Sequence, residues 1–226
     1  LSVTRLAAAF LMLPMFTQDS LPAMVRNSLF VGLAVITLAM QPIVPLGHLD
    51  LRGWLVLFGK EALLGVTIGF LSSGLLWAIE SAGHMIDTKA GTTMAQIVDP
   101  LTGHQTSLTG LFMGRLAGFV FMFSGGFLFM VGALIESYAL WPIAAPLPPI
   151  RPGAVSLLEG EFARIMLLAL AFAAPALVVL FVVDAALGLI NRYAQQLNVF
   201  MLAAPLKAVL GTAVVLLMLG TIVDAL

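Results

Sequence analysis

The sequence has 226 residues, of which 61% are hydrophobic and only 9% are charged, and its mean hydropathy is +1.11. Because a soluble domain carries roughly a quarter charged residues, this composition excludes an ordinary water-soluble globule and is typical of a membrane-type protein. The net charge of −1 without runs of one sign excludes a nucleic-acid-binding groove, and the absence of cysteine excludes disulfides, iron–sulfur clusters and thiol catalysis.

Six apolar stretches follow one another along the chain, at 3–16, 28–46, 54–79, 108–141, 162–190 and 199–226. Because a bilayer-spanning helix needs about 20 apolar residues, the third, fifth and sixth stretches each predict a spanning helix. The fourth is long enough for one tilted helix with a re-entrant piece or for two shorter helices, and the adjacent Gly125 and Gly126 favour a kink or break inside it. We therefore predict an all-α, polytopic membrane-type fold of five to seven apolar helices, some of them broken or kinked.

The chain begins at Leu1 without an initiator methionine, so we expect that residues precede it. The apolar segment Leu6–Phe16 lacks a basic flank and a cleavage site, and we interpret it as part of a first helix rather than as a signal peptide. Turn-forming residues separate the later stretches, at 17–22, Pro42, Pro45, Gly47, the polar run 81–107 and the proline-rich run 142–153. No linker is visible, which predicts a single domain over 1–226.

The connections between stretches carry cations almost evenly, at Arg26, Arg52, Lys89, Arg151 and Arg192. The positive-inside rule therefore assigns no orientation, which indicates that not every helix spans a bilayer in the usual way. No fixed-period repeat and no matched pair of interrupted helices is present, and this lowers the case for an inverted-repeat transporter.

Glycines recur at a spacing of four inside the apolar stretches, at Gly65 and Gly69 and again at Gly110, Gly114 and Gly118. This spacing puts each set on one helix face, where small residues let two backbones approach closely. The alternative is that glycine is simply commoner in membrane helices. We favour the packing role.

Ionisable residues inside the apolar stretches cost about 2.5–3.5 kcal/mol each at the centre of a membrane helix, so each needs a partner. They are Lys60, Glu61, Arg115, Glu136, Arg164, Asp184 and Lys207. We expect interhelical salt bridges, with a proton relay as the sharper alternative. Lys60 and Glu61 point about 100° apart on a helix, so we expect them to reach different partners rather than each other.

Catalytic motifs for zinc proteases, serine hydrolases and phosphate loops are absent from the sequence. His48, His84 and His104 all fall in predicted connections, so a zinc site would need long-range convergence. An intramembrane aspartyl protease would need two aspartates at depth, and only Asp184 lies well inside an apolar stretch. We predict no enzymatic activity and no cofactor.

Two separated blocks carry a resemblance to a known family. The first contains Lys60, Glu61, Gly65, Gly69, Gly83, Ile86, Asp87, Gly91, Pro100 and Gln105. The second contains Asp184, Gly188, Gln196, Asn198, Val199, Phe200, Pro205 and Lys207, and the N-terminal set is Arg5, Pro14, Pro22 and Arg26. Jointly these resemble the FliR/SctT family (YscT/SpaR-like) of type III secretion export apparatus proteins.

The run from Gly188 to Tyr193 and the proline-rich stretch after Trp141 resemble the injectisome branch more than the flagellar one. Ile97, Val98 and Asp99 before Pro100 depart from flagellar relatives.

The resemblance implies one subunit that packs into a larger helical hetero-oligomer and closes a pore for unfolded proteins. The partners it implies are subunits of the SctR/FliP and SctS/FliQ families, an SctU/FlhB-type switch protein, unfolded secretion substrates and membrane lipid. It also implies the bacterial inner membrane, with the assembly raised toward the periplasm. A stand-alone multipass transporter or channel is the alternative.

The polar connection after Gly91 suggests how such a pore would close. We hypothesise that residues 91–106 form a plug loop, with Gly91 and Gly103 as hinges, Met94, Ile97 and Val98 as a soft apolar seal, and Pro100 within it. An ordinary solvated loop is the alternative. As structural polar contacts we predict Lys60, Glu61, Asp87, Gln105, Asp184, Gln196, Asn198 and Lys207.

Overall fold

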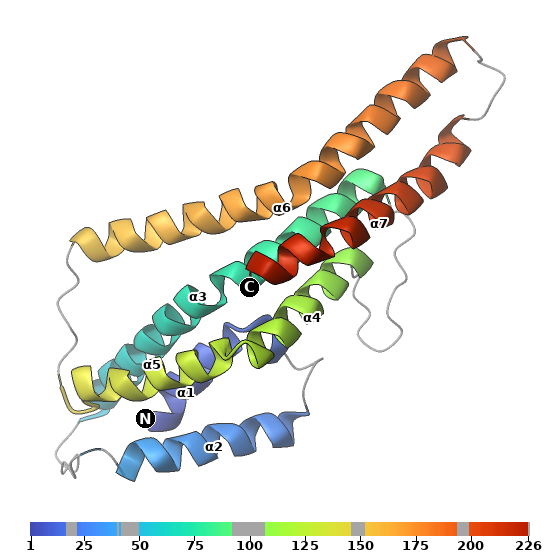
Figure 1. Ribbon diagram of the computed structural model, residues 1–226. Coiled ribbons are helices and arrows are strands. Elements are labelled where there is room, and N and C mark those ends of the chain that lie inside the picture. Colours follow the sequence, from blue (N-terminus) through green and yellow to red (C-terminus); the bar gives the residue numbers. More distant parts are fainter. Residues whose placement is uncertain are drawn as a thin grey trace. The chain divides into compact units, whose positions relative to one another are not determined.

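The computed structural model describes residues 1–16, 22–39, 41, 50–91, 107–145, 152–193 and 199–225 (Figure 1). All regular structure in these ranges is helical. The elements are α1 (Ser2–Leu11), the short 3-10 helix η1 (Pro14–Phe16), α2 (Ala23–Ala39), α3 (Leu51–Ala90), α4 (Leu108–Phe123), α5 (Gly126–Leu140), α6 (Pro152–Tyr193) and α7 (Val199–Ala225). The predicted all-α fold is confirmed.

Three of the described helices are long and apolar enough to cross a membrane: α3, α6 and α7. They correspond to the third, fifth and sixth apolar stretches, as predicted. The bent pair of α4 and α5 would make a fourth span, whereas α1 and α2 are shorter apolar helices.

The fourth apolar stretch is broken at Ser124 and Gly125, and α4 and α5 are bent by 68° at this break. Gly125 adopts φ +89°, a left-handed conformation that side chains with a Cβ rarely adopt. A Cβ at Gly126 would lie 2.5 Å from the ring of Phe121, so a larger residue there would require that ring to move. The expected break in this stretch is therefore confirmed, in the form of two shorter helices.

The third helix is longer than predicted. We expected a polar connection over 81–107, but α3 continues to Ala90, and His84 consequently lies in a helix rather than in a connection. Residues 80–90 contain no proline, and Ala82, Ile86 and Ala90 are buried at helical spacing, so packing on one face keeps a polar segment helical. Hydropathy alone underestimates such a helix because it averages over both faces.

The chain divides into two compact units that share α3, α4 and α6. Unit 1 comprises Leu1–Gly74 and Phe121–Phe162, and unit 2 comprises Leu75–Val120 and Ala163–Leu226. The single domain over 1–226 stays a prediction.

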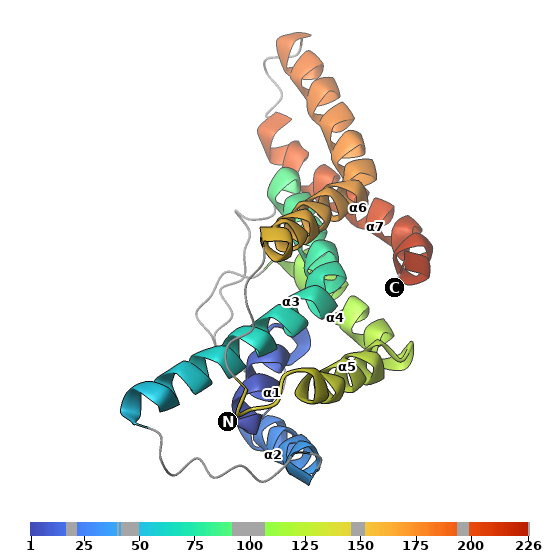
Figure 2. The same cartoon turned by 90° about the vertical axis from the view of Figure 1, so that its left-hand side faces the viewer.

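Unit 1 is built around α1, which Figure 2 shows surrounded by α2, α5 and the first part of α3. Leu6, Ala9 and Phe10 on α1 are buried. The ring of Phe10 lies 5.0 Å from Phe16, 5.4 Å from Phe30 and 5.9 Å from Phe127, measured between centroids. These aromatic contacts join α1, η1, α2 and α5 into one apolar core.

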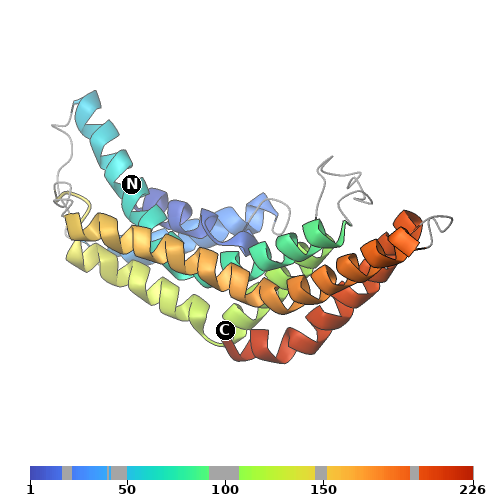
Figure 3. The same cartoon turned by 90° about the horizontal axis from the view of Figure 1, so that it is seen from above.

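Unit 2 pairs the last part of α6 with α7, which run side by side in Figures 1 and 3. Gly211 on α7 is buried, and a Cβ there would meet Ile86 of α3 and Leu180 of α6 at 3.8–3.9 Å, an ordinary packing distance. Three helices therefore converge at Gly211. Elsewhere α7 is largely exposed, because only 17% of its apolar window is buried within the chain.

Candidate functional site: charge clusters and glycine contacts

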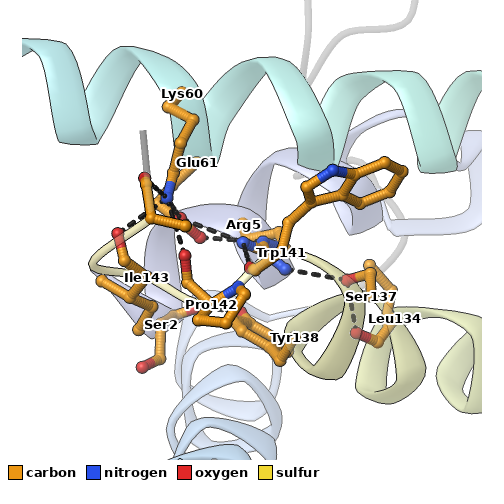
Figure 4. Close-up of polar contacts among 11 residues, drawn as sticks. Ser2, Arg5, Lys60, Glu61, Leu134, Ser137, Tyr138, Trp141, Pro142 and Ile143 are labelled. Atoms are coloured by element: carbon orange, nitrogen blue, oxygen red, sulfur yellow. Dashed lines mark hydrogen bonds and ion pairs between the residues drawn. The ribbon is translucent and has the colours of Figure 1, made fainter. Parts of the chain in front are cut away.

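Arg5 on α1 is the centre of a buried polar cluster in unit 1 (Figure 4). Its Nε and Nη2 donate to the two carboxylate oxygens of Glu61 on α3, at 2.8 and 3.0 Å, which forms a two-pronged ion pair. Nη1 donates to the hydroxyl of Ser137 at 3.0 Å, and Nη2 also donates to the carbonyl of Trp141 at 2.8 Å. Both charged side chains are 0% exposed, so this contact is protected from water.

Lys60 completes this group, which we call the Arg5 cluster (Arg5, Lys60 and Glu61). Its Nζ lies 3.1 Å from Glu61 Oε1, so the expectation that these neighbours would not pair with each other was wrong. The lysine side chain is long and flexible, so its Nζ can reach the carboxylate of the next residue although the two Cα–Cβ bonds point in different directions. Lys60 also reaches different partners, as expected, because Nζ donates to the carbonyls of Pro142, Ile143 and Ala145 at 3.0, 2.7 and 3.0 Å.

Carbonyl oxygens balance the charge of the Arg5 cluster. Two cations face one carboxylate, and the excess positive charge meets the four carbonyls of 141, 142, 143 and 145, which follow the end of α5. These carbonyls lie beyond the last turn of α5, and a carbonyl oxygen is a strong acceptor that suits a buried cation. Cations from α1 and α3 therefore hold the segment by which the chain leaves α5.

Tyr138 lines the same cluster from α5. The guanidinium carbon of Arg5 lies 4.0 Å from the centre of its ring, a cation–π contact, and its hydroxyl donates to the carbonyl of Ser2 at 2.7 Å. Neither Tyr138 nor Ser137 was among the predicted site residues, and Arg5 was noted only for its family resemblance. The signal for Arg5 was available, since a lone arginine within the apolar stretch 3–16 needs a partner as much as Lys60 does.

Gly65 and Gly69 lie against α1 in unit 1. A Cβ at Gly65 would overlap the carbonyl oxygen of Arg5, and one at Gly69 would overlap that of Ala9. Two successive turns of α3 therefore touch the α1 backbone directly. Because Gly65 lies one turn after Glu61, this close approach brings α1 near enough for Arg5 to reach the carboxylate.

Asp87 forms a second cluster in unit 2, where α3 meets the start of α4. One carboxylate oxygen accepts from the Ser107 hydroxyl at 2.6 Å and the Thr109 amide at 2.8 Å, and the other accepts from the Thr109 hydroxyl at 2.5 Å. The Ser107 hydroxyl in turn accepts from the amide of Gly110 at 2.9 Å. Two free amides of the first turn of α4 are thus satisfied, one by an N-cap serine and one by a carboxylate from another helix. Ser107 was not predicted, although a serine directly before an apolar helix is a typical N-cap.

Glycine also brings α3 and α4 together beside Asp87. A Cβ at Gly83 would lie 2.5 Å from the Cα of Gly110, and one at Gly114 would lie 3.2 Å from the side chain of Glu80. Gly118 is buried on the same helix. Gly110 and Gly114, predicted as packing residues, therefore both face α3.

Asp184 on α6 forms a third cluster, the Asp184 triad, with Lys89 of α3 and Lys207 of α7. Lys89 Nζ lies 2.9 Å from one carboxylate oxygen, and Lys207 is paired with the other. Lys207 and Asp184 were predicted contacts, whereas Lys89 was noted only as a loop cation. The triad joins three helices of unit 2.

Several predicted residues lie outside the described ranges: Met94, Ile97, Val98, Pro100, Gly103, Gln105, Gln196 and Asn198. Gly91 is described, with φ +78°, and its amide donates to the carbonyls of Asp87 and Thr88 at 3.1 and 3.3 Å. It is therefore the left-handed residue that ends α3. Arg115, Glu136 and Arg164 are exposed. Within the described ranges, no three histidine or acidic side chains converge as a metal site would require.

Comparison with known proteins gives a consistent result over the whole chain. The family described as bacterial export proteins, family 1, matches residues 1–226. The chain is 35% identical to Yop proteins translocation protein T of Yersinia pestis over 213 residues, which is 94% of this chain and 82% of the relative. It is 34% identical to secretion system apparatus protein SsaT of Salmonella typhimurium, covering 88% and 78%. It is 29% identical to flagellar biosynthetic protein FliR of Bacillus subtilis, covering 90% and 78%.

Proposed function

Since the chain belongs to the bacterial export proteins, family 1, which includes the FliR/SctT proteins of injectisomes and flagella, we propose that it closes a helical pore assembly through which unfolded proteins are exported. Membership of the family makes this chain a structural subunit of an export apparatus, with other apparatus subunits as partners. Its spanning helices and its relatives indicate the bacterial inner membrane. We further propose that its partners are subunits of the SctR/FliP and SctS/FliQ families and an SctU/FlhB-type protein. The assembly that they form is raised toward the periplasm in this proposal.

The observation that carries the proposal is the contrast between polar contacts and apolar surface. The Arg5 cluster and the Asp87 contacts are buried within the chain, whereas α6 and α7 have only 28% and 17% of their apolar windows buried. Large side chains on them, such as Phe181 and Leu217, are 65% and 85% exposed. A surface of this kind is covered by lipid or by the helices of other subunits.

The loop 91–106 is proposed as part of the element that closes the pore. What supports this is the way in which its flanking residues are held. Gly91 ends α3, and Asp87 on the last turn of α3 accepts hydrogen bonds from Ser107 and Thr109 at the start of α4. The residues that flank the segment on either side are therefore hydrogen-bonded to each other, so the segment begins and ends at the contact between α3 and α4.

Native mass spectrometry of the detergent-extracted complex tests the proposed function. The full chain is expressed with and without subunits of the SctR/FliP and SctS/FliQ families from the same organism. We expect one copy of this chain in a large hetero-oligomer with two kinds of small apolar subunit. A stable monomer or homodimer that ignores those subunits would instead indicate a stand-alone transporter or channel.

A further inference from the structure

The Asp184 triad differs from the other charge clusters in how its charge is balanced. Two ammonium groups share one carboxylate, which leaves one excess positive charge. The Arg5 cluster has the same formal excess, but there four backbone carbonyls offset it. In the described part of the chain, Lys89 and Lys207 make no ion pair or hydrogen bond except with Asp184. Lys89 has in addition only a cation–π contact of 5.8 Å with Phe181.

The triad is also open to a partner. The side chains of Lys89, Asp184 and Lys207 are 38%, 32% and 16% exposed, whereas those of Arg5, Lys60 and Glu61 are 0–1% exposed. The triad is therefore accessible from outside the chain, most of all at Lys89 and Asp184.

The helices that carry the triad expose apolar side chains. Phe181, one turn before Asp184 on α6, is 65% exposed. Val182 on α6 and Val209 on α7, which lie on other faces of their helices than the triad residues, are 59% and 67% exposed. A net positive charge within such a surface is costly once water is excluded. The hydrocarbon of lipid tails offers no group that could neutralise it, whereas a carboxylate does so.

A glycine one turn from Asp184 favours a helix as the occupant. Gly188 is exposed on α6, and a Cβ there would meet nothing within 4 Å. A glycine at an exposed helix position lets the backbone of another helix approach closely. Together with the excess charge, it describes a surface that is complementary to an apolar helix bearing one acidic side chain.

We propose that the Asp184 triad is the docking site for a carboxylate on an apolar helix of another subunit of the assembly. This inference rests on the proposed function, since it requires an assembly, and it adds the site and the chemistry of the contact. The acidic side chain pairs with Lys89 and Lys207, and its helix covers the exposed faces of α6 and α7.

Zero-length cross-linking tests the contact directly. A carbodiimide joins an ammonium group to a carboxylate only when the two already touch, forming an amide between them. We would treat the purified complex of the full chain with its neighbouring subunits, and then identify the linked peptides by mass spectrometry. The expected product joins Lys89 or Lys207 to an aspartate or glutamate of another subunit.

Substitution of Lys89 gives a second readout. Lys89→Gln leaves Asp184 balanced by Lys207, so the chain keeps its internal ion pair and should fold. It removes the excess charge, and we expect at least about tenfold weaker retention of the contacting subunit in detergent. Lys89→Arg should retain that subunit, and so should Arg192→Gln, a matched loss of one exposed cation on α6.

Three results would overturn the inference. The first is a complex in which Lys89 and Lys207 are linked only to carboxylates of their own chain. The second is an unchanged complex in the Lys89→Gln variant. The third is a variant that loses bound anionic phospholipid but no subunit, which would assign the site to a lipid headgroup. If the unsubstituted chain assembles with no other subunit, the proposed function fails as well, whereas an assembled complex without the cross-link overturns this inference alone.

Discussion

Arg5 connects more parts of unit 1 than any other single residue described above. It holds Glu61 of α3, Ser137 of α5 and the carbonyl of Trp141, and it stacks on Tyr138. Burying a guanidinium is tolerable because nearly all of its donors are satisfied and its charge is matched by Glu61. Such a buried pair contributes little net stability compared with apolar packing, but it is costly to break. The contacts of Arg5 thus link α1, α3 and α5 within unit 1.

Glu61→Gln should destabilise the chain strongly. The change keeps the shape of the side chain but leaves Arg5 and Lys60 buried without a countercharge, and we expect a loss of about 3–5 kcal/mol. The midpoint of thermal unfolding in detergent measures the effect. Glu136→Gln is the matched control, because Glu136 is exposed on α5 in the same unit. Equal midpoints for the two variants would mean that the Arg5 cluster does not hold unit 1 together.

Asp87→Ala should weaken the contact between α3 and α4. The alanine leaves the amide and the hydroxyl of Thr109 and the hydroxyl of Ser107 without their acceptor, and we expect a loss of about 1–3 kcal/mol. A thermodynamic cycle with Thr109→Val, which removes only the hydroxyl of Thr109, separates the side-chain contact from general damage. We expect the two substitutions to be non-additive by at least about 0.5 kcal/mol. Strict additivity would show that the two side chains act independently.

At the scale of the helices, glycine determines which pairs touch. Gly65 and Gly69 allow α1 to lie on α3, and Gly83 and Gly110 allow α3 to lie on α4. When every face of a helix is apolar, hydrophobicity does not determine which helices pair. The pairing then depends on shape and on how closely two backbones can approach. The break at Gly125 has a separate cause, namely its left-handed backbone.

Gly65→Ala should destabilise unit 1, whereas Gly59→Ala on the same helix should not. The methyl group at 65 would overlap the α1 backbone, but at 59 it would meet nothing within 4 Å. Because alanine favours a helix over glycine by about 1 kcal/mol, Gly59→Ala should be neutral or stabilising. The two thermal unfolding midpoints measure the difference. A Gly65→Ala midpoint as high as that of Gly59→Ala would remove the case for close packing at this position.

At the scale of the whole molecule, the chain presents apolar helices, and the buried charges in its described part, those of Arg5, Lys60, Glu61 and Asp87, have partners inside their own unit. The buried pairs need no outside partner, while the exposed faces of α6 and α7 do. This division of roles suits a subunit that first folds and then assembles. It also accounts for a composition that is almost entirely apolar yet carries ionisable groups within spanning segments.

Replacing Met94, Ile97 and Val98 together by glycine should increase ion leakage through the closed assembly. The reason is that glycine cannot supply the apolar side chains that would exclude water from the proposed seal. Conductance of the complex in planar bilayers, or dye release from vesicles, provides the measurement. A control replaces the exposed Leu128, Phe129 and Leu140 of α5 by alanine, which should not affect the seal. Unchanged leakage in the glycine variant would leave residues 91–106 as an ordinary loop.

The sequence by itself determined the class, the helical character, the family and the three helices that are long and apolar enough to span a membrane, because hydropathy and motif order are read directly along the chain. It also indicated the break at Gly125 and the need of Lys60, Glu61 and Asp184 for partners. It did not identify those partners. Arg5 meets Glu61 across 56 positions and Ser137 across 132, and only packing brings such groups together.

The tertiary structure likewise decided where α3 ends. Residues 81–90 are polar on average, but burial of one face and the Asp87 contacts with α4 keep them helical. It also determined that Lys60 contacts Glu61 as well as the carbonyls after α5. The contacts of Asp87 with α4 and of Lys60 with the carbonyls after α5 join segments that are distant in the sequence, and no local property of the sequence encodes them.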